Sequence, residues 1–142
     1  MKTCLLDVNV LLALAWPHHV HHGAVHAWWE TACPVRWATC TLTQLGFVRV
    51  SCNARFCPVP ATPAKALDVL RRMIARPDHD FWAEISAGLS DVAVSKRISA
   101  SLGHGQVTDS YLAVLAGIRG GSLVTLDRAL AAGHPDVAVL LS

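Results

Sequence analysis

Three aspartates stand at positions from which their carboxylates could share a metal ion. Asp7 ends the apolar run TCLLD, Asp127 ends the run SLVTLD, and Asp109 lies in the first turn of the helical segment TDSYL. Taken singly, each acid has an ordinary explanation in an Asx turn, a helix cap or a favourable charge at a helix start. Taken together, clustered carboxylates repel one another and need a cation to stay ionised at neutral pH. Oxygen ligands suit Mg²⁺ or Mn²⁺, and such an ion can activate water and stabilise a phosphoryl transition state.

The elements that carry these acids predict that they meet at one edge of a sheet. Continuous apolar runs predict buried strands, and apolar residues at helical spacing predict helices between them. We expect strands within 3–9, 35–40, 80–85, 122–127 and 137–141, and helices within 8–16, 19–32, 41–52, 62–76, 95–103 and 108–121. Strands that alternate with helices predict an α/β fold with a mostly parallel sheet, which binds its ligands beyond the carboxyl ends of the strands.

Two of the predicted helices depend on particular residues. Residues 41–52 fit a strand or a helix, and the spacing of their apolar side chains, with Thr41 or Thr43 as a possible cap, favours a helix. The segment 108–121 has Thr108 as its expected N-cap and ends in a glycine pair, which is typical of a helix stop.

Several segments together resemble a known family. LLDVNVLLALAW near the start, VTDSYLAVLA late in the chain and LVTLD near the end are similar to the motifs of a PIN domain, and TLTQLGFVRV is similar to the branch of VapC-type toxin ribonucleases. The likeness covers about residues 3–141. It implies that residues 1–142 form a single PIN domain, a three-layer α/β/α sandwich with a small, mostly parallel sheet.

The resemblance also implies a function. Proteins of this branch are Mg²⁺- or Mn²⁺-dependent endoribonucleases that cut structured RNA, commonly tRNA or ribosomal RNA, through attack of metal-activated water on a phosphodiester. They form homodimers and are blocked by a small cognate antitoxin of the VapB type. By motif, Asp7, Asp109 and Asp127 match the acids that hold the metal, and Asn9 and Thr125 match polar residues that flank and orient them.

One position departs from the wider family pattern. A Glu is usual in the helix after the second strand, and this chain has Gln44 there. An amide oxygen can still ligate a cation or hold its water, but it brings no charge, so we expect weaker metal binding at least. The alternative hypothesis is therefore a catalytically weakened, PIN-like module that binds RNA or an antitoxin.

The stretch HHVHHGAVH carries five of the eight histidines of the chain. If residues 18–26 are helical, His18, His22 and His26 form one stripe, and two histidines four residues apart could bind Zn²⁺. No HExxH arrangement accompanies them, and the acids lie on other elements. We favour a packing role on a helix surface, with an antitoxin or dimer surface and a true metal site as the alternatives.

Composition narrows the class of protein. The net charge is only +2 and the pI is about 8.4, too mild to indicate nucleic-acid binding, although basic side chains gather at Arg49, Arg55, Arg71, Arg72 and Arg76. These arginines predict either a solvated helix face or a surface for RNA phosphates.

The remaining patterns point to an intracellular protein. Five cysteines without a CxxC spacing predict buried, reduced thiols. No apolar run reaches the roughly 18 residues that a bilayer span needs, and the first residues lack the long acid-free core of a secretory signal. We therefore expect a soluble, cytoplasmic protein without a membrane partner. The sequence also lacks the GxxxxGK[ST] motif of P-loop proteins and the GxSxG motif of serine hydrolases.

Overall fold

The computed structural model describes residues 2–32 and 36–141, and its centre is a five-stranded sheet. The strands are β1 (Cys4–Leu6), β2 (Trp37–Thr39), β3 (His79–Phe81), β4 (Ser122–Thr125) and β5 (Ala138–Leu140). They lie in the order β3-β2-β1-β4-β5, and all four pairings are parallel. The α/β class is confirmed. The predicted strand 35–40 begins at a residue outside the described part of the chain.

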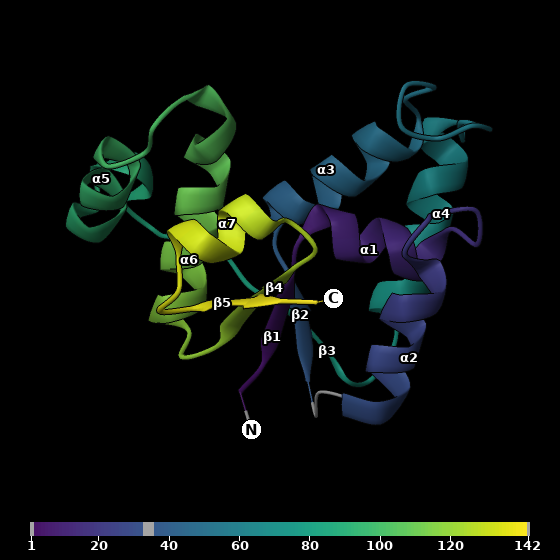
Figure 1. The fold of residues 1–142 in the computed structure, drawn as a ribbon, viewed down its shortest axis with the longest axis horizontal. Helices are drawn as coiled ribbons and strands as arrows, with labels where there is room; N and C mark the ends of the chain where they lie inside the picture. The colour runs from purple at the N-terminus through teal and green to yellow at the C-terminus, as the bar shows by residue number, and fades with distance from the viewer. Residues whose placement is uncertain (1, 33–35, 142) are drawn as a thin grey trace.

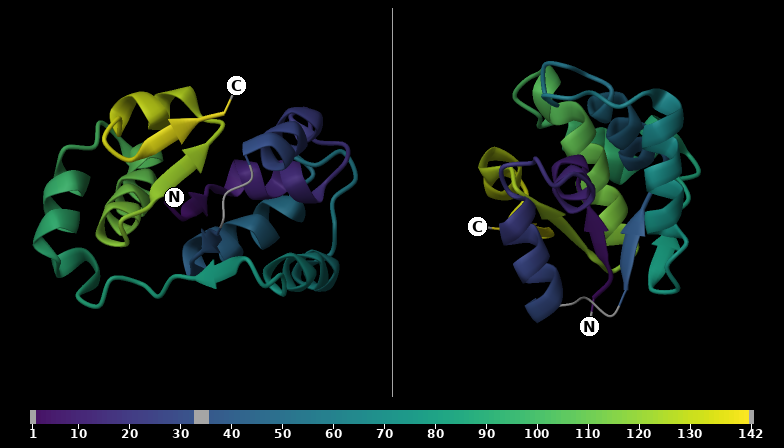
Figure 2. Two further views of the ribbon diagram at one scale, coloured as in Figure 1. Left: turned by 90° about the horizontal axis from the view of Figure 1, so that it is seen from below. Right: turned by 90° about the vertical axis from the view of Figure 1, so that its right-hand side faces the viewer.

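Helices cover both faces of this sheet. The chain forms α1 (Val8–Ala15), α2 (His22–Ala32), α3 (Thr41–Ser51), α4 (Pro63–Ile74), α5 (Val92–Ser99), α6 (Val107–Ile118) and α7 (Arg128–Gly133), with short 3-10 turns η1 (Gly88–Ser90) and η2 (His104–Gln106). In Figure 1, α1–α4 lie to one side of the strands and α5–α7 to the other, and the left view of Figure 2 shows the same separation.

The alternation of side chains along the strands explains the three layers. Neighbouring residues of a strand point to opposite faces. Leu5 is buried with the apolar residues of α5 and α6, whereas Leu6 is buried with those of α1, α3 and α4. Each face therefore has its own hydrophobic core, and the sheet is buried on both sides, as an all-parallel sheet requires.

The structure corrects several predicted helix boundaries. Thr108 is not a cap, because η2 leads directly into α6 and Gln106 precedes that helix. The helix expected over 95–103 begins earlier, since the Asp91 side chain accepts a hydrogen bond of 3.1 Å from the backbone N–H of Val94. The helix α7 was not predicted, because its six residues are too few to show a helical period.

The choice of a helix for residues 41–52 is confirmed, and its cap lies one residue earlier than expected. Cys40 is the N-cap residue of α3, and its backbone N–H donates 3.0 Å to the hydroxyl of Thr43. The helix then passes close to α1 at Gly46, where an added Cβ would lie 2.6 Å from Val8 Cγ2. Gly46 therefore allows the helix that carries Gln44 to approach the helix that follows Asp7.

The cysteines and the membrane prediction are also addressed by the structure. Cys4, Cys40, Cys52 and Cys57 are free thiols, and burial raises the pKa of Cys4, Cys40 and Cys57. Cys33 lies outside the described residues. Within residues 2–32 and 36–141, no helix has both the length and the apolar character needed to cross a membrane.

Candidate active site

Asp7 lies where β1 passes into α1, and it is almost fully buried. Its backbone N–H donates to the Val124 carbonyl of β4 over 2.9 Å, and its side chain caps α1 by accepting a 2.8 Å hydrogen bond from Val8 N–H. The second carboxylate oxygen accepts a 2.7 Å hydrogen bond from the Thr125 hydroxyl. Burial raises the pKa of Asp7 and the negative charge of Asp127 adds to the rise, while the bonds from Thr125 and Val8 oppose it. These two hydrogen bonds hold the carboxylate in one orientation, while its burial makes the ionised form less stable.

Thr125, the last residue of β4, ties this acid to its neighbours. Its hydroxyl oxygen accepts hydrogen bonds from the side-chain amide of Asn9 over 3.4 Å and from the backbone N–H of Asp127 over 3.0 Å. The Asn9 carbonyl oxygen in turn accepts from Leu126 N–H over 3.2 Å. The structure thus brings the predicted flanking residues into one hydrogen-bond network with Asp7.

Asp127 directly follows the same strand and begins α7. Its Oδ1 accepts hydrogen bonds of 2.9 Å from Ala129 N–H and 3.2 Å from Leu130 N–H. A carboxylate at a helix N-terminus is favoured by the positive end of the helix dipole. The cap fixes the side chain of Asp127 beside the end of β4.

Asp109 reaches the same edge from α6. It is partly buried in the first turn of that helix. Burial is the main reason that its pKa rises to about 6, and the negative charges of Asp7 and Asp127 raise it further. Asp109 therefore belongs to the same edge of the sheet as Asp7 and Asp127, whose charges contribute to its pKa shift.

Gln44 belongs to a separate hydrogen-bond chain. Its side-chain N–H donates 3.0 Å to the hydroxyl of Thr39, at the end of β2, and that hydroxyl lies 2.8 Å from Nε2 of His79. Within the described residues, the hydrogen bonds of Gln44 do not join it to Asp7 or Thr125. The structure therefore places Gln44 at the carboxyl edge of the sheet but anchors its amide to β2.

One residue that sequence reasoning missed helps to place two site helices. The Glu84 carboxylate accepts a hydrogen bond from the Tyr111 hydroxyl of α6 and another, of 3.2 Å, from the Thr41 N–H at the start of α3. Burial, and then the hydrogen bond to Glu84, raises the pKa of Tyr111 to about 12. Nothing in the segment DFWAEI, which suggested a strand, signals this link between α3 and α6.

The donor set fits a hard divalent cation. Asp7, Asp109 and Asp127 offer only carboxylate oxygens, and none of them forms an ion pair with Lys or Arg within the described residues. The described residues also contain no preformed cage of three or more His, Cys, Asp or Glu side chains for a metal. Hard divalent cations are often held by only one or two carboxylates and keep several waters. The uncompensated charge at the sheet edge is the observation that favours such an ion.

The histidine cluster has a different use. The helix α2 begins at His22, so His18 does not lie on a helical stripe with His22 and His26 as predicted. Instead, His22 Nδ1 lies 2.7 Å from the Ala13 carbonyl and His26 Nε2 lies 3.0 Å from the Leu14 carbonyl. Both rings satisfy carbonyls at the end of α1, which have no partner within that helix. For these two histidines the packing role is confirmed.

Comparisons with known proteins agree with this geometry. A family model for the PIN domain matches residues 4–133. The chain is 44% identical over 135 residues to Ribonuclease VapC39 of Mycobacterium tuberculosis, with 91% of each chain covered. It is 42% identical over 139 residues to Ribonuclease VapC29 of the same organism, with 98% of this chain and 96% of that one covered.

Solved structures show the same fold at much lower sequence identity. The structure of VapC20 from Mycobacterium tuberculosis, described as a toxin that cleaves the sarcin–ricin loop, matches with a TM-score of 0.68 at 13% identity and covers 92% of this chain and 94% of that chain. A protein from Pyrobaculum aerophilum matches with a TM-score of 0.59 at 21% identity, covering 96% of this chain and 83% of that one.

Proposed function

This chain belongs to the PIN-domain family, in its VapC branch, and we propose on that basis that it is a metal-dependent endoribonuclease that acts as the toxin of a toxin–antitoxin pair. The observation that carries the proposal is the match to PIN-domain ribonucleases over most of the chain, together with Asp7 and Asp127 held by hydrogen bonds at the carboxyl edge of β1 and β4. The names of its relatives support ribonuclease activity, and the acid cluster supplies the chemistry for it.

We propose that Asp7, Asp109 and Asp127 hold the cation, and that it is Mg²⁺ or Mn²⁺. When bound, such an ion supplies Lewis-acid stabilisation of phosphoryl oxygens and lowers the pKa of water. The chain's own residues prepare the site for it. Thr125 and Val8 N–H fix both oxygens of Asp7, and the helix cap fixes Asp127, so that little reorganisation is needed when the charges are neutralised.

We propose that the RNA backbone follows the arginines of α3, α4 and the loop between them. Arg49, Arg55 and Arg71 are exposed and form no ion pair within the described residues. Arg72 is paired with Asp68 over 2.9 Å on an exposed helix face, which is a weak interaction that a phosphate can displace. The substrate is a structured RNA, either tRNA or ribosomal RNA.

The remaining properties of the proposal follow the family. We propose that residues 1–142 act as a single PIN domain in the cytoplasm, that two chains form a homodimer, and that a VapB-type antitoxin blocks the acid site. Reduced cysteines at positions 4, 40, 52 and 57 are consistent with a reducing compartment.

A binding module with weakened catalysis is the second candidate, and Gln44 motivates it. A Glu at this position would add a fourth negative charge near the sheet edge, whereas Gln44 is tied by its amide to Thr39. The three aspartates are all present, so catalysis that needs only these acids is the better supported function.

The decisive experiment is cleavage of total RNA by the antitoxin-free protein. Reactions with Mg²⁺, with Mn²⁺ and with EDTA are compared for the wild type, for Asp7→Asn and for Asp68→Asn, which makes the same chemical change on the exposed face of α4. We expect discrete cuts that need metal, that disappear in Asp7→Asn and that persist in Asp68→Asn. Absence of cutting by the wild type, or cutting that survives Asp7→Asn, would favour the binding module.

A further inference from the structure

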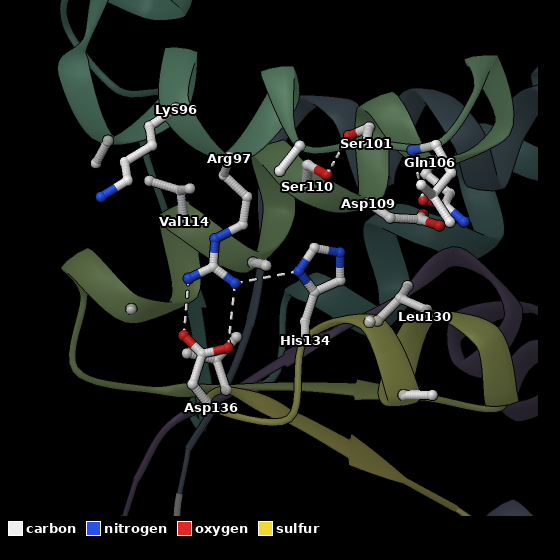
Figure 3. Close-up of a pocket in the computed structure, with 18 of the residues that line it drawn as sticks. Lys96, Arg97, Ser101, Gln106, Asp109, Ser110, Val114, Leu130, His134 and Asp136 are labelled. Carbon is white, nitrogen blue, oxygen red and sulfur yellow. Dashed lines mark hydrogen bonds and ion pairs between the residues drawn. The ribbon is translucent and has the colours of Figure 1, made fainter.

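A groove of about 1020 Å³ opens between α5, α6 and α7, beside the acid site. We call it the α5–α7 groove. Asp109 lines one end of it, and Arg97, His134 and Asp136 line another part, as Figure 3 shows. Its size lies at the upper end of the range for small-ligand sites. The groove is therefore large enough for a nucleotide and is continuous with a residue of the proposed active site.

Much of the wall of the groove is apolar and made of small side chains. Ala93 comes from α5, Ala113 and Val114 from α6, and Leu130 from α7. Small residues on facing helices leave a gap between them because no long side chain fills it. Such walls suit a flat, largely apolar group such as the face of a nucleobase.

One nitrogen of His134 is fixed as a hydrogen-bond acceptor. The His134 side chain is buried, with only 8% of the residue exposed, and its Nδ1 lies 3.1 Å from Nη1 of Arg97. A guanidinium group can only donate, so Nδ1 must accept, and the proton of the neutral ring then resides on Nε2. Burial lowers the pKa of His134 and the charge of Arg97 lowers it further, while the charge of Asp136 opposes this.

Arg97 is itself held in place. Its guanidinium donates to both oxygens of Asp136, over 3.1 Å and 2.7 Å. This bidentate pair has a defined geometry, and it fixes the orientation of the imidazole through the third bond. The tautomer and the ring orientation of His134 are therefore set before any ligand arrives.

The other nitrogen, Nε2, is the donor that this arrangement leaves to a ligand. Within residues 2–32 and 36–141, no hydrogen bond uses it, and in Figure 3 it lies on the side of the ring away from the bond to Arg97. Among the described residues no buried side-chain nitrogen or oxygen lacks a partner, so Nε2 is reached by solvent, and a ligand acceptor in the groove would replace water there. A nucleobase offers such acceptors as carbonyl oxygens and ring nitrogens.

The Asp109 end of the groove is polar. The hydroxyls of Ser101 and Ser110 lie 2.7 Å apart, Gln106 accepts a hydrogen bond of 3.1 Å from Leu102 N–H, and Asp109 lines the same end of the groove. Hydroxyl and amide groups next to the acid suit the sugar and phosphate of a nucleotide. A polar end, an apolar wall and an oriented donor follow one another along the groove, and this order matches a nucleotide whose phosphate lies at the proposed metal site.

We propose that the α5–α7 groove binds one nucleotide of the RNA substrate next to the scissile phosphate, with its base against the apolar walls and hydrogen-bonded to His134 Nε2–H. This inference rests on the proposed ribonuclease function and adds a specificity-determining residue to it. The groove lining includes Asp109 of the proposed metal site, and this continuity favours a nucleotide of the RNA over a protein segment.

Two substitutions at His134 separate the donor from the rest of the side chain. Asn places a polar group near the position of Nδ1 and removes Nε2, whereas Gln can place an N–H near the position of Nε2. His21→Asn makes the same change at an exposed histidine before α2 and serves as the matched control. Binding of a fluorescein-labelled ten-nucleotide single-stranded RNA of mixed sequence is measured by anisotropy in EDTA. We expect His134→Asn to bind three- to tenfold more weakly, as one lost hydrogen bond predicts, and His134→Gln and His21→Asn to bind within about twofold of wild type.

A second measurement uses only the wild-type protein and decides the question even if the variants do not fold. The four ribonucleoside 5′-monophosphates, which contain no phosphodiester bond to be cut, are titrated in the presence of Mg²⁺ while NMR follows the His134 ring nitrogens and the amides of Ala113 and Leu130. Shifts of these signals, with a proton on Nε2 throughout, are the expected result. Unmoved groove signals, or unchanged RNA binding in a folded His134→Asn protein, would overturn the inference and leave the groove to a protein partner.

The two proposals fail in different ways. If the wild type cuts RNA but the groove signals do not respond to nucleotides, only the groove inference is wrong. If nucleotides shift the groove signals but no RNA is cut with Mg²⁺ or Mn²⁺, the nucleotide site stands and the ribonuclease function is wrong.

Discussion

Replacing Asp109 by Asn is expected to stabilise the metal-free protein at neutral pH. The pKa of Asp109 rises from 3.8 to about 6, chiefly through burial and then through the charges of Asp7 and Asp127. No hydrogen bond or ion pair holds this carboxylate within the described residues, so the amide loses no partner. The variant removes a repulsive charge and keeps the shape of the side chain.

The size of the expected stabilisation follows from the pKa shift of Asp109. At about 1.4 kcal/mol for each pKa unit, the shift corresponds to roughly 3 kcal/mol before screening. Asp109 is only partly buried, and screening by solvent reduces this to roughly 1.5 kcal/mol. The variant also loses a favourable negative charge at the start of α6, which lowers the expected gain in stability by about 0.5 kcal/mol. We therefore expect a net gain of about 1 kcal/mol, which for a domain of this size is a rise in Tm of about 2–4 °C.

The stability difference between Asp109→Asn and the wild type should depend on pH. Because the folded protein binds the Asp109 proton more tightly than the unfolded chain does, the stability that this proton supplies is present below about pH 4 and is lost as pH rises through about 6. The advantage of Asp109→Asn should therefore be absent near pH 4, grow between pH 4 and 6.5, and stay constant above that. Adding Mg²⁺ at pH 7.5 should raise the Tm of the wild type more than that of the variant.

Thermal unfolding in EDTA across this pH range, followed by circular dichroism, tests the prediction. Asp68→Asn on the exposed face of α4 is the matched control, and we expect it to change stability by less than about 0.5 kcal/mol at every pH. A variant at Asp109 that is less stable than wild type at pH 7.5, or an advantage that does not depend on pH, would refute the idea that burial and the charges of Asp7 and Asp127 destabilise the ionised Asp109 carboxylate.

Three further predictions concern the same site and its approach. Thr125→Val should lower kcat/KM for RNA cleavage by roughly 10- to 100-fold, because it frees the Asp7 carboxylate. Thr125→Ser keeps the hydroxyl and should retain most of the wild-type rate. Equal losses in both variants would contradict an orienting role for the hydroxyl. The affinity for Mg²⁺, measured by calorimetry, should be constant above pH 7 and should fall up to tenfold per pH unit below about pH 6, as Asp109 takes up its proton. An affinity that does not change from pH 5 to 7.5 would count against Asp109 as a ligand. The double variant Arg49→Gln, Arg71→Gln should weaken RNA binding and reduce the dependence of log Kd on log salt concentration by about 1–2, whereas Arg119→Gln, just before β4 begins, should leave that slope unchanged.

Much of the fold could be predicted from local patterns in the sequence. The continuous apolar runs at β1 and β4 predicted buried parallel strands, and the helix expected within 62–76 agrees with α4, whose N-cap is Thr62. These signals involve residues close together in the chain. The predicted start of α5 was too late in the chain, because its N-cap, Asp91, is one of several polar residues in this segment that could cap a helix.

The network around the acids shows where sequence reasoning reaches its limit. Asp7 and Thr125 are separated by 118 residues, yet their side chains lie 2.7 Å apart because β1 and β4 are neighbours in the sheet. Motif likeness placed both residues near the metal, but neither their bond nor the raised pKa of Asp109 could be read from spacing. The same holds for Glu84, which joins α3 to α6 from a segment without any motif.

The sequence by itself determined which residues can do the chemistry: three carboxylates at the ends of apolar runs, and motifs that identify the family. Residue types and short-range spacing are sufficient for that, because they fix local structure and donor chemistry. Only the tertiary structure decided how the charges act on one another, which histidines cap α1, and that His134 presents its Nε2–H to a groove beside Asp109. Burial, electrostatic coupling and tautomer all depend on which distant segments pack together, and that is a property of the folded chain.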